Sequence, residues 1–205
     1  MESFKTEQEY FWVGSFGDDY IDRNSVDLLP RKVSFWSEIL RRTSGVQSIL
    51  ELGANIGLNL SAIRTLIPAV RCTAVEINEK AVSELRKNGF EEVVHDSILN
   101  YSPNSEWDFV FTCGVLIHID PEHLPQVYDL LYHASNNYIL VAEYYNPTPV
   151  EILYRGNERR AFKRDFAGEM LDRFSDLHVL DYGFRWHRDT FPSDDITWFL
   201  LQKTR

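Results

Sequence analysis

The chain has 205 residues, of which 44% are hydrophobic and 25% are charged, as expected for one globular domain with a sizeable core. Its formal net charge of −10 argues against nucleic acid or an anionic membrane as a partner. Because no apolar run reaches transmembrane length and the N-terminus lacks the apolar core of a signal peptide, we expect a cytoplasmic protein.

The N-terminal segment is rich in aromatic side chains. Residues 10–20 contain five of them, before any predicted strand begins, and Arg23 follows closely. One interpretation is a cap over a ligand pocket, with Arg23 binding a carboxylate. The other is an apolar arm that packs on the domain or on a second subunit, which allows a homodimer. We therefore expect residues 1–45, the arm and a helix with a buried Trp36, to cap a main domain of residues 46–205.

The first predicted strand ends in a glycine turn. Residues 49–52 form an apolar run interrupted by Glu51, and a helical pattern follows the turn at once. Glycine lets the backbone approach a ligand closely, and a helix start offers free N–H groups. The middle of the turn is Asn55 and not glycine, which favours a nucleoside ligand without phosphates. Four residues are candidates for binding it: Glu51, Gly53, Asn55 and Gly57.

The second predicted strand, residues 72–75, ends in Glu76. An acidic side chain about 20 residues after the glycines is placed to accept hydrogen bonds from ribose hydroxyls. Asn78 then caps the next helix. The glycine turn and Glu76 together predict a nucleoside-binding α/β domain.

Further elements continue the alternation of strand and helix. The expected strands are Val93–Val94, residues 107–113, residues 138–142, and a final pair, 177–184 and 196–202, that forms a hairpin at the sheet edge. Asp120 and Pro121 begin a helix before the fifth strand. Cys72 and Cys113 lie in strands and are expected in the core, and no metal-ligand cluster is evident. The fold class is α/β, with a doubly wound, mostly parallel sheet of seven strands.

The sequence Glu-Leu-Gly-Ala-Asn-Ile-Gly at residues 51–57 resembles motif I of class I S-adenosylmethionine (SAM)-dependent methyltransferases. The resemblance implies a Rossmann-like fold and SAM as cofactor, with glycines beneath its methionine part and Glu76 on the ribose. It also implies that an acid after the third strand reaches the adenine amino group. In this chain that acid is Asp96, and the backbone of the next residue, Ser97, contacts the adenine ring. Thr112 and Gly114 lie at the end of the fourth strand, where the family brings cofactor and acceptor together. We expect the arm to close over the cofactor, with Tyr20 or Arg23 near the methionine carboxylate.

Over most of its length the chain also looks like the methyltransferases known as pseudaminic acid biosynthesis-associated methylases. The segment that carries this likeness is Glu-Gln-Glu-Tyr-Phe-Trp-Val-Gly-Ser-Phe-Gly-Asp-Asp-Tyr-Ile-Asp-Arg-Asn, residues 7–24, together with the glycine turn. The likeness implies a small-molecule acceptor and N- or O-methylation of a nonulosonate sugar or its precursor.

The residues after the fifth strand suggest a different acceptor. Glu143 and Glu151 flank two tyrosines, Tyr144 among them, where an open α/β sheet places its ligand chemistry. Two carboxylates can hold a guanidinium by charge-assisted bonds. This two-glutamate clamp is the interpretation that we favour, ahead of a nonulosonate acceptor, and it predicts N-methylation of a small amine or guanidine such as free arginine. The alternative is that Glu143 is a solvated strand end and Glu151 a helix N-terminal acid.

Two further features bear on the acceptor. Five cations fall within residues 155–164, which indicates either an anion site or, more often, a solvated helix face. His118 follows the fourth strand, where it serves either as a general base and acceptor contact or as a packed core histidine.

Overall fold

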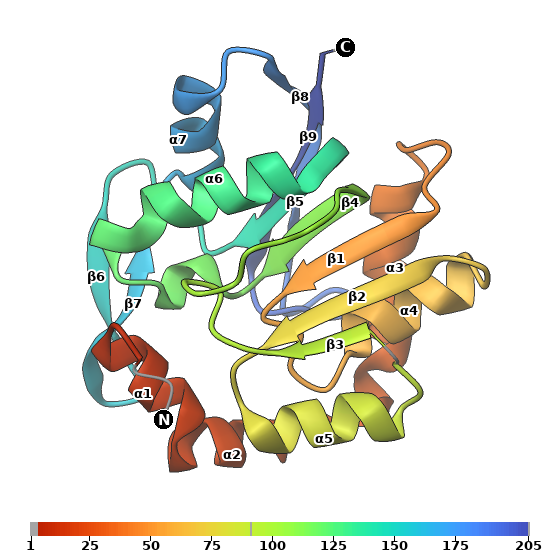
Figure 1. Ribbon diagram of the computed structural model, residues 1–205. Helices are drawn as coiled ribbons and strands as arrows, with labels where there is room; N and C mark the ends of the chain where they lie inside the picture. The colour runs from red at the N-terminus through yellow and green to blue at the C-terminus, as the bar shows by residue number, and fades with distance from the viewer. Residues whose placement is uncertain (1–3, 91, 205) are drawn as a thin grey trace. The chain divides into compact units, whose positions relative to one another are not determined.

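The computed structural model describes residues 4–90 and 92–204 (Figure 1). Its helices are α1 (Glu7–Val13), α2 (Ser15–Ile21), α3 (Leu29–Leu40), α4 (Leu58–Leu66), α5 (Glu79–Lys87), α6 (Leu124–Ala134) and α7 (Phe166–Arg173). The short 3₁₀ turns are η1 (Val26–Leu28), η2 (Leu116–His118) and η3 (Pro121–His123). The strands are β1 (Ser48–Leu52), β2 (Arg71–Glu76), β3 (Glu92–His95), β4 (Trp107–Cys113), β5 (Ser135–Glu143), β6 (Val150–Tyr154), β7 (Asn157–Lys163), β8 (Leu177–Arg185) and β9 (Ile196–Lys203).

The main sheet has seven strands in the order β3-β2-β1-β4-β5-β9-β8. β1 and β3 both run parallel to β2, and β4 runs parallel to β5. β9 is antiparallel to β5 and to β8, which forms the predicted terminal hairpin. The predicted seven-stranded, mostly parallel α/β fold is therefore confirmed. The chain divides into two compact units, one ending at Ser102 and the other beginning at Pro103, and each is described by itself.

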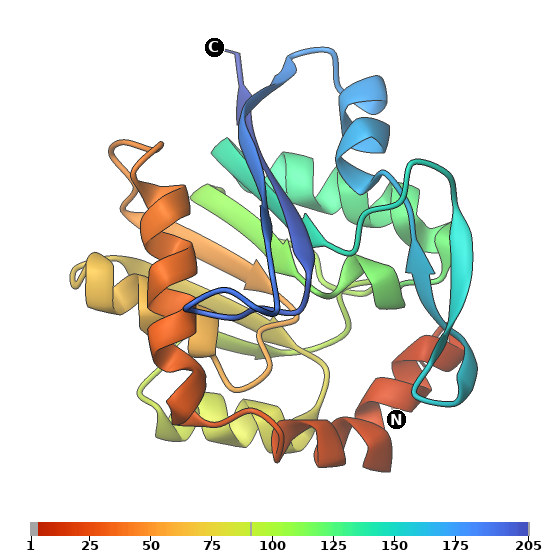
Figure 2. The ribbon, with the colours of Figure 1, turned by 180° about the vertical axis from the view of Figure 1, so that it is seen from behind.

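The first unit is built on β1, every residue of which is buried. α3 packs on α4 (Figure 2), and the side chain of Trp36 is fully buried there, as the sequence predicted. Its indole N–H donates to Oδ1 of Asn59 over 3.3 Å, so the polar edge of the ring has a partner. This packing fixes the start of α4, which follows the glycine turn.

The second unit is built on β4 and β5, with α6 and α7 packed on them. Val127 and Leu131 of α6 are fully buried. Asp120 accepts a hydrogen bond from the Glu122 amide over 3.1 Å and so begins η3, from which α6 continues. The predicted cap at Asp120 is therefore confirmed, although the first turn after it is a 3₁₀ turn.

The basic run of residues 155–164 is not a helix face, which corrects one sequence-based expectation. It lies in the separate antiparallel pair β6–β7, and Tyr154 pairs with Asn157 across a two-residue turn. The turn residues Arg155 and Gly156 have φ angles of 50° and 84°, the left-handed geometry that tight hairpin turns require. Arginine is uncommon at positive φ in such turns, so the amino-acid sequence alone did not predict a hairpin here. Glu151 accordingly lies on a strand and not at a helix N-terminus.

Two negative findings apply to residues 4–90 and 92–204. No helix there has both the length and the apolar character needed to cross a membrane. No cluster of three or more histidine, cysteine or acidic side chains is arranged to hold a metal ion. Cys72 and Cys113 are free thiols; Cys72 is buried, as expected, whereas Cys113 is only partly buried.

Candidate functional site

The turn after β1 depends on left-handed backbone at three positions. Gly53, Asn55 and Gly57 have φ angles of 77°, 50° and 81°, and asparagine tolerates this region better than most residues do. The Gly53 amide donates to the Val75 carbonyl over 2.8 Å, which holds the turn against the end of β2. A Cβ at Gly57 would lie 2.7 Å from the Leu85 side chain, so this glycine also serves helix packing.

Glu76, at the end of β2, joins this turn to the next loop. Its side chain is buried, one carboxylate oxygen accepts the Asn55 amide over 2.7 Å, and the other accepts the Asn78 amide over 2.8 Å. Burial raises the pKa of Glu76, and the backbone N–H donors oppose that rise. Each carboxylate oxygen has two lone pairs, so the group can accept further hydrogen bonds from two hydroxyls.

Glu51 lies one strand away and is 1% exposed. One of its oxygens accepts the Asn59 side-chain amide over 2.7 Å. The other oxygen, Oε2, has no hydrogen-bond partner among the described residues. Burial raises the pKa of Glu51 to about 8. A buried polar atom without a partner is costly, and here it leaves a place for a donor from a ligand.

The raised pKa of Glu51 makes stability depend on pH. The unfolded carboxyl loses its proton near its ordinary pKa of 4.5, and the folded one near 8. Between these values the folded chain binds more protons, so the free energy of unfolding falls as pH rises. Glu51→Gln removes this contribution. Urea unfolding measures the free energy of unfolding at about pH 5 and pH 8. From the lower to the higher pH, that free energy should fall by a few kcal/mol more in the native chain than in the variant. An equal change in both proteins would contradict the raised pKa of Glu51.

The loop after β3 carries the other two predicted residues of this unit. The Asp96 amide donates to the Glu76 carbonyl over 3.1 Å, so this loop adjoins the previous one. The Asp96 carboxylate accepts the Ser97 amide over 2.7 Å and is only partly buried. The Ser97 hydroxyl is buried and donates to the carboxylate of Glu9 in α1. The Ser97 side chain therefore faces the N-terminal arm.

The aromatic residues of the arm form a cluster of their own. The rings of Trp12 and Tyr20 meet edge to face at 5.3 Å, and Phe11 stacks on Phe16 at 4.1 Å. The guanidinium of Arg23 lies over the rings of Phe16 and Tyr20, at 5.5 Å and 6.0 Å from their centroids. Arg23 and Tyr20 therefore lie together in the arm, and the position of either residue near the methionine carboxylate stays a prediction.

In the second unit, Thr112 and Gly114 mark the end of β4. Thr112 is fully buried, and Gly114 has a φ of 71° and donates its amide to the Ala142 carbonyl over 2.9 Å. The backbone then turns into η2, which carries His118.

Glu143, at the end of β5, holds this turn. Its carboxylate is buried and accepts the amides of Val115 and Leu116 over 3.0 Å each, and that of Ile117 over 3.4 Å. Burial raises the pKa of Glu143 to about 7, against the effect of these N–H groups. An acid that accepts several backbone amides fixes a loop, and here that loop positions His118.

His118 is 7% exposed. Its Nδ1 lies 2.6 Å from the Arg160 carbonyl of β7. The rings of His118 and Tyr154 contact each other edge to face, with their centroids 4.6 Å apart. Because a carbonyl only accepts, Nδ1 carries the proton and Nε2 is the basic nitrogen of the neutral ring. Burial lowers the pKa of His118 to about 4, which keeps the ring neutral at physiological pH.

The two-glutamate clamp is not supported by this geometry. Glu143 is buried with both oxygens bonded to backbone amides, whereas Glu151 is exposed and accepts the Arg159 amide over 2.6 Å. Tyr144 instead lies beside Lys163, whose ammonium is 5.3 Å from the centroid of the ring. The contribution of β7 to the surroundings of His118 depends on the β6–β7 hairpin, so no residue pattern around His118 alone predicts it.

Comparison with known proteins identifies solved structures of similar fold. No protein-family model matches the sequence, and no curated protein matches it. The plantazolicin methyltransferase BpumL in complex with SAH is similar with a TM-score of 0.67 and 14% sequence identity, over 97% of this chain and 94% of that chain. A SAM-dependent methyltransferase from Leishmania major has a TM-score of 0.71 and 13% identity, over 97% of this chain and 82% of that chain. The glycopeptide N-methyltransferase MtfA has a TM-score of 0.63 and 15% identity, over 84% of this chain and 95% of that chain. The chain therefore has the Rossmann-like fold of SAM-dependent methyltransferases.

Proposed function

We propose that this protein is a SAM-dependent methyltransferase whose cofactor is held by the unit that ends at Ser102. The observation that carries the proposal is the buried carboxylate of Glu76, which accepts one amide from the glycine turn and one from the cap of α5. A carboxylate so fixed is ready to accept both ribose hydroxyls. The unpartnered oxygen of Glu51 suits the cationic end of the cofactor, and Asp96 suits the adenine amino group.

Several related structures support this choice of cofactor. The glycopeptide N-methyltransferase MtfA was crystallised with SAM and with sinefungin, and BpumL with SAH. When bound, SAM supplies an activated methyl group on its sulfonium. The residues of this chain then have to orient the acceptor, exclude water and remove a proton. Nε2 of His118 is the proton acceptor that we assign, with Glu143 and the Arg160 carbonyl holding the ring in place.

The acceptor that we propose is a small polar metabolite with a carboxylate, of the nonulosonate sugar type. Arg155 and Arg159 are exposed on the β6–β7 hairpin. Lys163, at the end of the same hairpin, lies over the ring of Tyr144, which follows β5. Such cations favour an anionic acceptor. The sequence resemblance to methylases associated with pseudaminic acid biosynthesis favours the same class.

A guanidine or amine acceptor such as free arginine is the second candidate. It is favoured by the exposed carboxylate of Glu151 and by the aromatic ring of Tyr144, which is only partly buried. It is weakened by Glu143, whose oxygens already accept three backbone amides.

Calorimetric titration with SAM, followed by an assay of SAH release, tests the proposal. The panel should contain a nonulosonate sugar, its nucleotide-linked form, free arginine and simple amines. We expect SAM to bind and the carboxylated sugar to be methylated. Methylation of arginine with no reaction of the sugars would establish the second candidate, and absence of SAM binding would overturn the cofactor assignment.

A further inference from the structure

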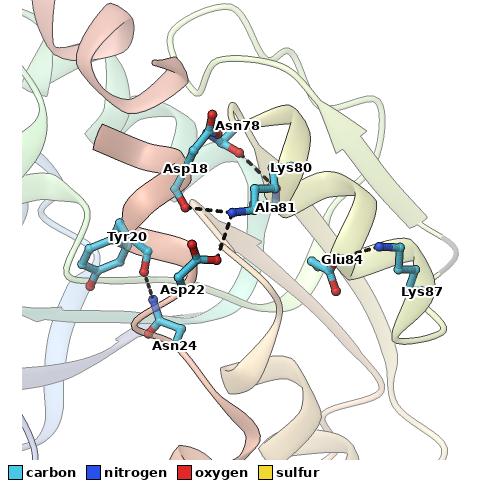
Figure 3. A network of polar contacts seen from close by, with 9 residues as sticks. All are labelled: Asp18, Tyr20, Asp22, Asn24, Asn78, Lys80, Ala81, Glu84 and Lys87. Atoms are coloured by element: carbon cyan, nitrogen blue, oxygen red, sulfur yellow. Dashed lines mark hydrogen bonds and ion pairs between the residues drawn. The ribbon is translucent and has the colours of Figure 1, made fainter. Parts of the chain in front are cut away.

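Asn78 connects the candidate cofactor loop to the N-terminal arm. It is 4% exposed, and its backbone amide donates to Glu76 over 2.8 Å. Its side-chain oxygen caps α5 by accepting the Ala81 amide over 3.0 Å. Its side-chain nitrogen donates to the Trp12 carbonyl over 3.1 Å and to the Asp18 carboxylate over 2.9 Å. Figure 3 shows Asn78 between α5 and the arm residue Asp18.

The orientation of this amide is fixed by chemistry. Ala81 at the start of α5 offers a donor, so the oxygen of the Asn78 amide must face α5. Its NH₂ group must then face the arm, where Trp12 and Asp18 both present acceptors. Two donors meet two acceptors at a buried position, where an unmatched group would be costly.

The arm is shaped for this contact. A Cβ at Gly17 would lie 1.9 Å from the Trp12 carbonyl oxygen and 3.0 Å from the Asn78 amide nitrogen, so only glycine permits this approach of α2 to α5. Lys80 adds an exposed ion pair with Asp22 at 2.9 Å, which is screened by solvent and contributes little.

A second anchor lies at the beginning of α1. Glu9 accepts the Ser97 hydroxyl in the loop after β3, and it also closes a capping box with Thr6. The Lys5 ammonium donates to the Leu99 carbonyl over 2.6 Å. The arm is therefore tied to the loops that follow β2 and β3; the first begins directly after Glu76 and the second carries Asp96.

We propose that Asn78 is a positioning residue that couples docking of the arm to cofactor binding. Its backbone amide holds the Glu76 carboxylate, and its side chain holds the arm. A docked arm therefore stabilises the position of Glu76 for the cofactor, and a fixed Glu76 stabilises the docked arm. Because such coupling is reciprocal, a bound cofactor should also protect the arm from opening. This inference rests on the proposed function, since it takes Glu76 as a cofactor ligand.

The test uses the full chain and the variant Asn78→Asp. Aspartate keeps the oxygen that caps α5, and it replaces the NH₂ group with an oxygen that faces the Trp12 carbonyl and the Asp18 carboxylate. Hydrogen exchange of residues 7–22 without ligand should become at least about tenfold faster, and the Kd for SAH should rise about 5- to 150-fold. In the native chain, added SAH should slow exchange of the same amides.

Two further variants remove the alternative explanations. Asn78→Asp also places charge near Glu76, so Gly17→Ala, which disturbs the same contact from the arm and adds no charge, should produce the same two changes. Lys87→Gln is the matched control, and it should change neither measurement appreciably because its exposed ion pair with Glu84 lies within α5 and does not involve the arm.

Each outcome has one meaning. Unchanged exchange of the arm in both Asn78→Asp and Gly17→Ala would overturn the anchor. A loosened arm with an unchanged Kd for SAH would overturn the coupling. If the native chain itself does not bind SAH, the cofactor proposal fails and the coupling fails with it, while the exchange data still decide whether Asn78 anchors the arm.

Discussion

Replacing Glu76 with alanine should weaken SAM binding about 5- to 150-fold, equivalent to roughly 1–3 kcal/mol. The carboxylate is positioned by the Asn55 and Asn78 amides, so the acceptor for the ribose hydroxyls is organised before the cofactor arrives. Its removal deletes charge-assisted hydrogen bonds and also releases the glycine turn from the next loop. Calorimetric titration of the folded variant measures the loss.

The neighbouring Glu79 provides the control for this experiment. It is exposed in the first turn of α5, so Glu79→Ala should change SAM affinity and stability by only a few tenths of a kcal/mol. Glu76→Ala leaves two amides without their acceptor and so also lowers stability, which means that binding must be measured well below its unfolding temperature. Unchanged affinity in a folded Glu76→Ala protein would remove the basis of the cofactor assignment.

Replacing His118 with asparagine should lower kcat about 10²- to 10⁴-fold while leaving SAM affinity unchanged. The asparagine amide can donate to the Arg160 carbonyl from the place of Nδ1, so the contact with β7 is kept. The basic nitrogen in the place of Nε2 is lost. His118→Ala, which loses both, should lower kcat by a similar factor but also reduce stability.

The pH profile provides an independent check on His118. Its pKa of about 4 predicts that the rate falls only as pH approaches that value, and not near the ordinary histidine pKa of 6.5. Between 4 and 6.5 the unfolded chain binds more protons than the folded one. The free energy of unfolding should therefore fall as pH falls through this window. A kinetic transition near 6.5 that disappears in His118→Asn would show that the ring is solvated in the working enzyme.

The local pattern of the sequence was enough to predict the strand and the helix cap that frame the first half of the candidate site. The apolar run before Glu51 predicted a fully buried strand, and the helix cap at Asn78 is present. Both are signals within a few residues of each other, and they agree with the tertiary structure. What the local pattern could not reveal was the second use of Asn78, because its partners Trp12 and Asp18 lie about 60 positions earlier in the chain.

The second half was predicted less well, for reasons of tertiary context. Glu143 was predicted to face an acceptor, but its position at the end of β5 places it against the amides of η2. The side chain of a strand-end acid can be solvated, bound to a ligand or bound to its own backbone, and only the fold decides among these. The hairpin was missed because its turn places Arg155, rather than asparagine, at a positive φ.

That hairpin has a consequence for how this protein can evolve. β6 and β7 form a sheet of their own, separate from the seven strands that contain the core. Non-glycine residues at positive φ, Arg155 and Arg159, add local backbone strain, so the hairpin should open at a lower free energy than β4 and β5. Substitutions of its exposed side chains, such as those of Arg155 and Arg159, can therefore accumulate without endangering global folding. Acceptor preference is thus expected to diverge among relatives of this chain faster than cofactor binding, because the exposed cations that we assign to recognition lie outside the main sheet.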